Sequence, residues 1–234
     1  MELVNGECAI DYPTVLLIHG DTARPILDYS RNRETLTNTN NAMSSTITPK
    51  FGAGQSIYSP TNGYTSWAAK VVSADYTKPM TIEFWVYLGS APAGSLNFAG
   101  EVVSAASPQN GDWTFFWTNG TGFRFWRWIG TTFTLVHAEL GPTTLTTGWH
   151  HVFAQTNSGT SISVGYDGTI YNNAGVSSIS IQPNAAAFAF GGANPAKYGP
   201  VVSAIDQYFQ ELRITDGVAR FPATGTYPLP QRQS

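Results

Sequence analysis

The sequence is poor in charged residues. Asp, Glu, Lys and Arg make up 12% of its 234 residues, about half the usual share, and the net charge is −3. The 12 Lys and Arg are scattered and form no run that could neutralise phosphates. We therefore expect no nucleic-acid partner, and a surface built from Thr, Ser, Asn, Gln and Gly.

Cysteine and long apolar runs are also scarce. The single cysteine, Cys8, excludes an intramolecular disulfide. The apolar run at residues 15–18 has the length of a strand and is far short of the roughly 20 residues that span a bilayer. Residues 1–7 lack the positive flank and apolar stretch of a signal peptide. We expect no signal peptide and no membrane insertion.

Helical periodicity is nearly absent, whereas turn residues are dense, with 23 Gly and 14 Pro. Residues 81–88 alternate as a strand does. Asn119-Gly120 and Asp167-Gly168 each separate two strand-like runs, and such residue pairs tolerate the positive φ of a tight hairpin turn. Together these patterns predict an all-β protein of at least ten short strands. In residues 81–88, one face carries Ile82, Phe84, Val86 and Leu88, and the other carries Thr81, Glu83, Trp85 and Tyr87. Both faces hold large apolar residues, which is typical of a central strand covered on both sides or of one with an aromatic-lined outer face.

Six segments resemble, in the correct order, the strand signatures of the laminin-G-like domains in the concanavalin A-like lectin/glucanase superfamily. The similarity is greatest to the domains of bacteriophage tail and other virion proteins. The resemblance implies a jelly-roll sandwich of two antiparallel sheets at residues 13–230. The sequence outside this range predicts an N-terminal arm at residues 1–12 and a frayed C-terminus at 231–234. The segments are residues 15–21, 28–32, 50–56, 81–87, 148–154 and 211–221.

The resemblance implies three uses for the chain: carbohydrate binding, glucan hydrolysis or a structural role. Glucanases of this superfamily carry a Glu-x-Asp-x-x-Glu strand, because retaining hydrolysis needs two carboxyls about 5–5.5 Å apart. That pattern is absent, and Glu139 and Glu211 are alone on their predicted strands. We therefore expect no catalytic residues, and hydrolysis is the third choice.

The favoured function is a non-enzymatic component of a phage-like virion: a tail-fibre, receptor-binding or capsid-decoration module that can also recognise carbohydrate. The alternative is a purely structural assembly protein whose aromatic face docks another virion subunit. The expected partners are other virion subunits and a cell-surface glycan, in an oligomer or larger assembly. The expected location is the virion, after synthesis in the host cytoplasm.

Four of the seven Trp lie on one predicted hairpin, residues 113–128. On its second strand Arg124, Trp126 and Trp128 share a face. Pyranose rings stack on aromatic side chains, and Arg or Asp binds sugar hydroxyls. Two other readings remain open: both faces are covered in the core, or the aromatic face is a protein interface. The predicted ligand-binding residues are Trp126, Trp128, Arg124 and Asp112.

The resemblance also implies a structural Ca²⁺ site. Its ligands would be Asp21 and Asp28 near the start and Glu211 near the end. Ca²⁺ takes six to eight oxygen ligands, mostly from loops. Gln210 stands where the family often has Asp, and a neutral amide weakens such a site.

Other polar and aromatic positions receive structural roles. His150 and His151 are adjacent on a predicted strand, so they face opposite sides and cannot chelate one metal together. Glu83 and Arg213 are predicted to form a partly buried ion pair. Trp149 begins an apolar strand and is predicted to be buried in the core.

Overall fold

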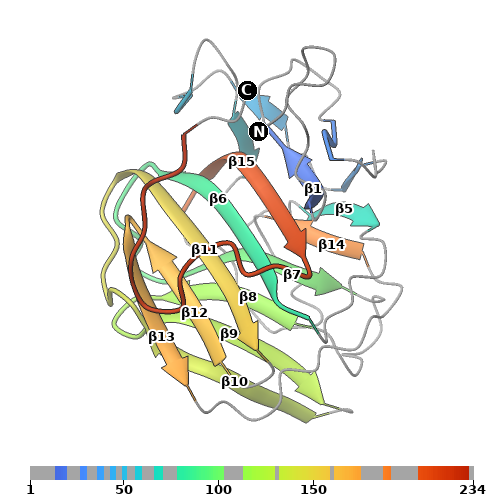
Figure 1. Cartoon of the computed structure of the whole chain (residues 1–234). Helices are drawn as coiled ribbons and strands as arrows, with labels where there is room; N and C mark the ends of the chain where they lie inside the picture. Colours follow the sequence, from blue (N-terminus) through green and yellow to red (C-terminus); the bar gives the residue numbers. More distant parts are fainter. Residues whose placement is uncertain are drawn as a thin grey trace.

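The computed structural model shows an all-β chain, and the residues that it describes contain no helix (Figure 1). Consequently no described helix is long and apolar enough to span a membrane. Residues 1–12, predicted as an N-terminal arm, lie outside the described part, as do 232–234. The described residues are 14–19, 27–30, 36–39, 43–45, 49–51, 56–59, 66–70, 78–102, 113–129, 132–158, 161–174, 187–190 and 205–231.

The first sheet has nine antiparallel strands. Its order is β16-β13-β12-β11-β6-β15-β4-β3, and β1 also pairs with β15. The long strands β6, β11 and β15 form the centre of this sheet. The strands are β1 (Thr14–Ile18), β3 (Met43–Ser45), β4 (Ser56–Ser59), β6 (Met80–Leu88), β11 (Gly148–Ser158), β12 (Ser161–Tyr166), β13 (Thr169–Ala174), β15 (Gln207–Asp216) and β16 (Gly225–Thr226).

The second sheet has seven antiparallel strands in the order β10-β9-β8-β7-β14-β5-β2. The two antiparallel sheets confirm the predicted concanavalin A-like sandwich. The strands are β2 (Leu36–Thr39), β5 (Ser66–Lys70), β7 (Ser95–Val102), β8 (Trp113–Thr118), β9 (Gly122–Ile129), β10 (Thr132–Leu140) and β14 (Ala187–Phe190).

The core lies between the two sheets. The alternation predicted for β6 is confirmed. The side chains of one face point into this core and are at most 1% exposed: Ile82, Phe84, Val86 and Leu88. They meet rings from the second sheet, for example Phe84 against Phe98, with ring centroids 5.4 Å apart. Each such ring removes about 150–250 Å² from water. The second sheet contributes Leu96, Phe98, Phe115, Trp117, Phe123 and Phe125 to this core.

Both predicted hairpins are confirmed. β8 pairs with β9 around Asn119-Gly120, and β12 pairs with β13 around Asp167-Gly168. Gly120, Asp167 and Gly168 all have positive φ, at 76°, 45° and 88°. The second turn therefore has the left-handed backbone at both central positions that a two-residue hairpin requires.

After β15 the chain crosses the outer face of the first sheet. Figure 1 shows this segment, in dark red, passing in front of β11 and β12. We call residues 217–231 the strap. Its backbone is tied to the sheet by side chains: Gln155 bonds both the N–H and the carbonyl of Phe221, and Ser163 Oγ donates to the carbonyl of Ala223. Phe221 and Tyr227 of the strap pack with Phe153 in a second apolar cluster.

The prediction that Trp149 is a core residue is wrong. Val152 and Ala154 face the core, so the alternation of β11 places Trp149 on the outer face with His151. There Trp149 is partly exposed and pairs with Tyr87 of β6. The strand was predicted correctly, but its phase was assigned one residue out.

Candidate functional site

The aromatic hairpin places its rings on two faces. Phe115, Trp117, Phe123 and Phe125 point into the core. Arg124 pairs with Phe116 on the opposite face and is partly exposed, whereas Phe116 is only 2% exposed. That face is therefore covered at Phe116. The side chains of Trp126 and Trp128 and all of Asp112 lie outside the described residues, so this ligand site stays a prediction.

The predicted calcium ligands have protein partners. Asp28 is 4% exposed; its Oδ1 accepts from the N–H groups of Leu17 and Ser30, and its Oδ2 accepts from Ser30 Oγ. Glu211 lies 3.0 Å from Nδ1 of His19. Asp21 lies outside the described residues. Asp28 and Glu211 thus have protein partners, and the calcium site, whose third predicted ligand is not described, stays a prediction. Among the described residues no cluster of three His, Cys, Asp or Glu could hold a metal.

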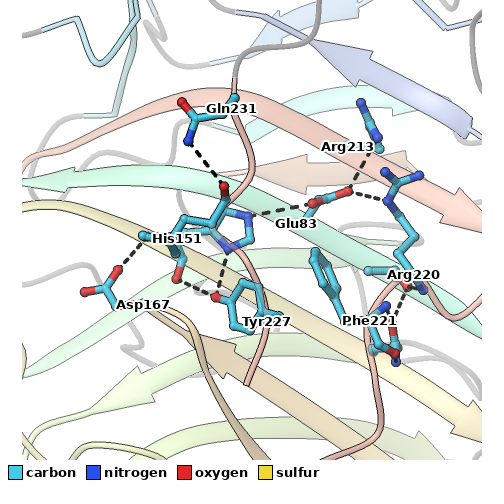
Figure 2. Close-up of polar contacts among 11 residues, drawn as sticks. Glu83, His151, Asp167, Arg213, Arg220, Phe221, Tyr227 and Gln231 are labelled. Carbon is cyan, nitrogen blue, oxygen red and sulfur yellow. Dashed lines mark hydrogen bonds and ion pairs between the residues drawn. The ribbon is translucent and has the colours of Figure 1, made fainter. Parts of the chain in front are cut away.

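A buried charge cluster lies under the strap, centred on Glu83 of β6 (Figure 2). Its Oε1 is 2.7 Å from Nε of Arg220 and 3.7 Å from Nη1 of Arg213, and its Oε2 is 3.7 Å from Nε2 of His151. The predicted ion pair of Glu83 and Arg213 is thereby confirmed. It is joined by Arg220, a strap residue that sequence reasoning did not connect to it.

The cluster keeps Glu83 ionised. Burial alone would raise the pKa of Glu83, but the contact with His151 and the charges of Arg220 and Arg213 outweigh it and lower the pKa below 4.5. The contacts of Arg220 and Arg213 are ion pairs rather than well-aligned hydrogen bonds. The cluster thus holds the strap to the sheet chiefly by charge.

The two histidines have separate structural partners, as predicted. His151 places Nδ1 2.9 Å from Oη of Tyr227 on the strap. His150 places Nδ1 2.7 Å from Oδ2 of Asp167, while Oδ1 of that residue accepts from the backbone N–H of His151. Figure 2 shows His151 between Glu83 and Tyr227. The pair therefore links the strap and the β12–β13 turn to β11.

A small pocket beside the cluster brings two carboxylates together that the sequence placed on different strands. Glu83 and Glu211 line it with Trp85, and Pro230 and Gln231 of the strap also line it. Its volume is about 10 Å³, the space of one water molecule. A pyranose ring does not fit. A glycosidase also needs one carboxyl with a raised pKa as its acid, and the lowered pKa of Glu83 does not suit it to that role.

A row of four aromatic rings crosses the outer face of the first sheet beyond the strap. The residues are directly paired in the ladder: Tyr58 of β4 with Tyr208 of β15, Tyr208 with Tyr87 of β6, and Tyr87 with Trp149 of β11. Their ring centroids are 5.1, 5.9 and 5.7 Å apart. Tyr58, Tyr87 and Trp149 are partly exposed, and Tyr208 is 9% exposed. We call these four residues the aromatic row.

The aromatic row is firmly positioned. Its backbones belong to four hydrogen-bonded strands, and Ile57, Val86 and Phe209, the neighbours of its tyrosines, are anchored in the core. At one end lies Asp206. Burial, followed by the negative charge of Asp206, raises the pKa of both Tyr58 and Tyr208 above 10.0. These tyrosines therefore stay neutral and keep hydroxyls that can donate and accept hydrogen bonds.

Sequence reasoning missed this row. It placed Tyr87 on the face of residues 81–88 opposite Ile82 and left open whether that face is covered. Tyr58 and Tyr208 are 150 positions apart and gave no shared local pattern. Only the pairing of β4, β15, β6 and β11 brings them into line. Trp149 was assigned to the opposite face.

Residues 59–219 match a laminin G-type family model described as the concanavalin A-like lectin/glucanases superfamily. The match covers more than half of the chain. The chain belongs to this superfamily. A search of curated proteins found no matching relative.

Solved structures with the same fold include binding domains of botulinum neurotoxins and of a mosquitocidal protein. The binding domain of botulinum neurotoxin serotype C1 is 10% identical, with TM-score 0.60, and the match covers 87% of this chain and 48% of that one. The binding domain of Paraclostridial Mosquitocidal Protein 1 is 12% identical, with TM-score 0.60 and coverage of 89% and 50%. The serotype D ligand binding domain, in complex with N-acetylneuraminic acid, is 11% identical, with TM-score 0.58 and coverage of 89% and 48%.

The chain thus spans about half the length of these structures. At this level of identity the likeness shows the fold and assigns no residue of this chain a role.

Proposed function

We propose that this chain is a non-enzymatic carbohydrate-binding module that recognises glycans through the aromatic row. The observation that carries the proposal is the alignment of four aromatic residues across the sheet, three of which are partly exposed: Tyr58, Tyr87 and Trp149. The C–H faces of pyranoses stack on such rings, and the tyrosine hydroxyls can bond sugar hydroxyls at the same time. A rigid row of this kind loses little entropy when it binds.

The comparisons support a binding role. The superfamily includes lectins as well as glucanases, and the structural neighbours are binding domains, one of them solved with a sialic acid. The lowered pKa of Glu83 and the water-sized pocket disfavour the glucanase use. We place the binding site at the aromatic row because of the geometry of its side chains, and not because a structural neighbour was solved with a sugar.

We further propose that the module serves a phage-like virion as a tail-fibre, receptor-binding or capsid-decoration component. The support is the resemblance of the six sequence segments to virion proteins. In that setting the glycan would lie on the surface of the host cell. Detection of the chain by mass spectrometry in purified particles tests this placement, and its absence from them would refute it.

The test of the binding function is a glycan array probed with the purified chain. We expect retention of a restricted group of glycans, and loss of retention for Tyr87→Ala with the melting temperature preserved within a few degrees. Tyr171→Ala is a matched control, because Tyr171 is also partly exposed but lies on β13, away from the row. An array without any retained glycan would refute the proposal. No reducing sugar should be released from the glycans that bind.

A further inference from the structure

We propose that the strap is an acid-released lid: protonation of Glu83 detaches residues 217–231 from the outer face of the first sheet while both sheets remain folded. This inference does not depend on glycan binding. It follows from the separation of the strap from the core, from the charges that meet at Glu83, and from the glycine through which the strap leaves the sheet.

The strap is structurally separate from the sandwich. None of its residues, all of which the structure describes, belongs to the core between the two sheets. Its packed rings, Phe221 and Tyr227, belong to the smaller cluster with Phe153. Tyr227, at 5% exposed, is the one buried residue of the strap. The strap can therefore open locally without exposing the main core.

Neutral contacts hold the backbone of the strap in position. The N–H of Arg220 donates to Thr81 Oγ1, the N–H of Phe221 donates to Gln155 Oε1, and the N–H of Tyr227 donates to a backbone carbonyl of the β12–β13 turn. Each such bond contributes little net stability, because the same groups can bond to water when the strap opens. The charges beneath the strap add the part of its attachment that depends on pH.

Cationic groups from two strands and the strap face Glu83 (Figure 2). Arg220 of the strap lies 2.7 Å from its Oε1, and Arg213 of β15 lies 3.7 Å from the same oxygen. His151 of β11 lies 3.7 Å from its Oε2. Protonation of Glu83 leaves both guanidinium groups facing a neutral carboxylic acid, so it removes the attraction between the strap and β6.

The other titratable groups around the cluster have partners of their own. Tyr227 of the strap places its Oη 2.9 Å from Nδ1 of His151. Glu211 lies across the small pocket and is paired with His19. Asp167, in the β12–β13 turn, accepts from the backbone N–H of His151 and also contacts His150. We therefore assign the acid response of the strap to Glu83.

Opening the strap relieves the charge imbalance that protonation creates. Arg213 is 3% exposed, and Pro230 and Gln231 of the strap line the small pocket beside it. A buried charge that loses its counter-charge is strongly destabilising unless water reaches it. When the strap moves away, Arg220 leaves with it and water reaches Arg213. The protonated state of Glu83 thus favours the open strap, and the ionised state favours the closed one.

Glycine supplies a hinge, and opening enlarges the exposed outer face. The strap leaves β15 through Gly217, whose φ is 79°, and glycine changes its backbone angles at little steric cost. Opening uncovers His151 and Phe153, which are 1% and 0% exposed. Trp149 lies on the same face of β11, two positions before His151. The uncovered surface therefore continues the aromatic row along β11.

The experiment is amide hydrogen exchange of the intact chain, followed by nuclear magnetic resonance from pH 6 to pH 3 with correction for the intrinsic effect of pH. Burial opposes ionisation of Glu83, but its contacts lower its pKa below 4.5, so the closed strap is stabilised above that pH and loses this stabilisation as the pH falls through the folded pKa. We expect the protection of the Phe221 and Tyr227 amides to fall at least about 10-fold in acid, while β6 amides stay at least about 100-fold better protected.

Variants separate Glu83 from other acid effects. Glu83→Gln imitates the protonated side chain at pH 7, so its strap amides should already exchange as in the parent chain in acid. Arg220→Gln removes the charge of the strap and leaves Glu83 with Arg213; strap protection should fall at least about 3-fold at pH 6 and respond less to acid. Asp167→Asn is the matched control, because asparagine tolerates the positive φ of this position. It should change strap protection by less than about 3-fold.

The outcomes decide the proposal. Strap amides that stay protected in acid, or that exchange together with those of β6 at every pH, would overturn it. A closed strap in Glu83→Gln at pH 7, or release of the strap by Asp167→Asn to the same extent, would also overturn it. If Glu83→Gln does not fold, Arg220→Gln decides: unchanged strap protection refutes the lid, and reduced protection with a weaker acid response supports it.

Discussion

Replacing Glu83 by Gln should destabilise the fold strongly, because it removes the counter-charge of two arginines. Glu83 is 5% exposed, and its partner Arg213 is 3% exposed. Breaking a buried ion pair by removing one partner costs about 3–5 kcal/mol. The side chain of Arg220 is 21% exposed and can still reach water. We therefore expect the free energy of unfolding to fall by about 3 kcal/mol, near the lower end of that range.

The measurement is urea denaturation of Glu83→Gln and of the parent chain at pH 7, with the exposed Lys78→Gln as control. The loss should appear as a lower midpoint at an unchanged slope, and the control should change stability by less than about 0.5 kcal/mol. A loss below about 1 kcal/mol for Glu83→Gln would refute the claim that these charges depend on one another.

The pH dependence gives a second reading of the same cluster. The pKa of Glu83 is lower in the folded chain than its ordinary 4.5, so its stabilisation is fully present above pH 4.5 and is lost as the pH falls through the folded pKa. The stability difference between the parent chain and Glu83→Gln should therefore be constant from pH 5 to 7 and shrink below pH 4.5. A difference that persists undiminished well below pH 4.5 would contradict this account.

Three further predictions concern the outer face of the first sheet. Gly165→Ala should cost about 1–3 kcal/mol or more, because a Cβ there would overlap the ring of Phe153; an unchanged melting temperature would show that the ring can move aside. Phe221→Ala should cost about 2 kcal/mol, since this ring stacks on Phe153 at 4.1 Å, and should speed proteolysis of the strap before the sheets unfold. Trp149→Ala should cost less than about 2 kcal/mol of stability, which is less than the loss expected for a tryptophan buried in the core. Thermal melting measures this difference.

Much of the fold follows from local sequence patterns. The alternation in residues 81–88 identified β6 and the two sets of side chains on its opposite faces, because side chains along a strand alternate with a period of two. Asn119-Gly120 and Asp167-Gly168 identified two hairpins, because few other residue pairs accept their backbone angles. These features depend on residues close together in the chain, which is why sequence alone revealed them.

The strap and the aromatic row could not be predicted in the same way. The strap depends on contacts such as Arg220 with Glu83, across 137 positions of the chain. The row depends on strand order, which places β15 between β4 and β6. Trp149 shows a different failure: Gly148 and Trp149 both open the strand, and only the burial of Val152 and Ala154 sets its phase.

The most direct test of the central claim is nuclear magnetic resonance of the chain with its tyrosine rings ¹³C-labelled, titrated with the tightest-binding oligosaccharide. We predict that the ring signals of Tyr58, Tyr87 and Tyr208 shift together and saturate at one affinity, while those of Tyr171 and Tyr227 stay in place. Saturable binding that leaves the three row tyrosines unmoved would contradict the claim that the aromatic row is the glycan site.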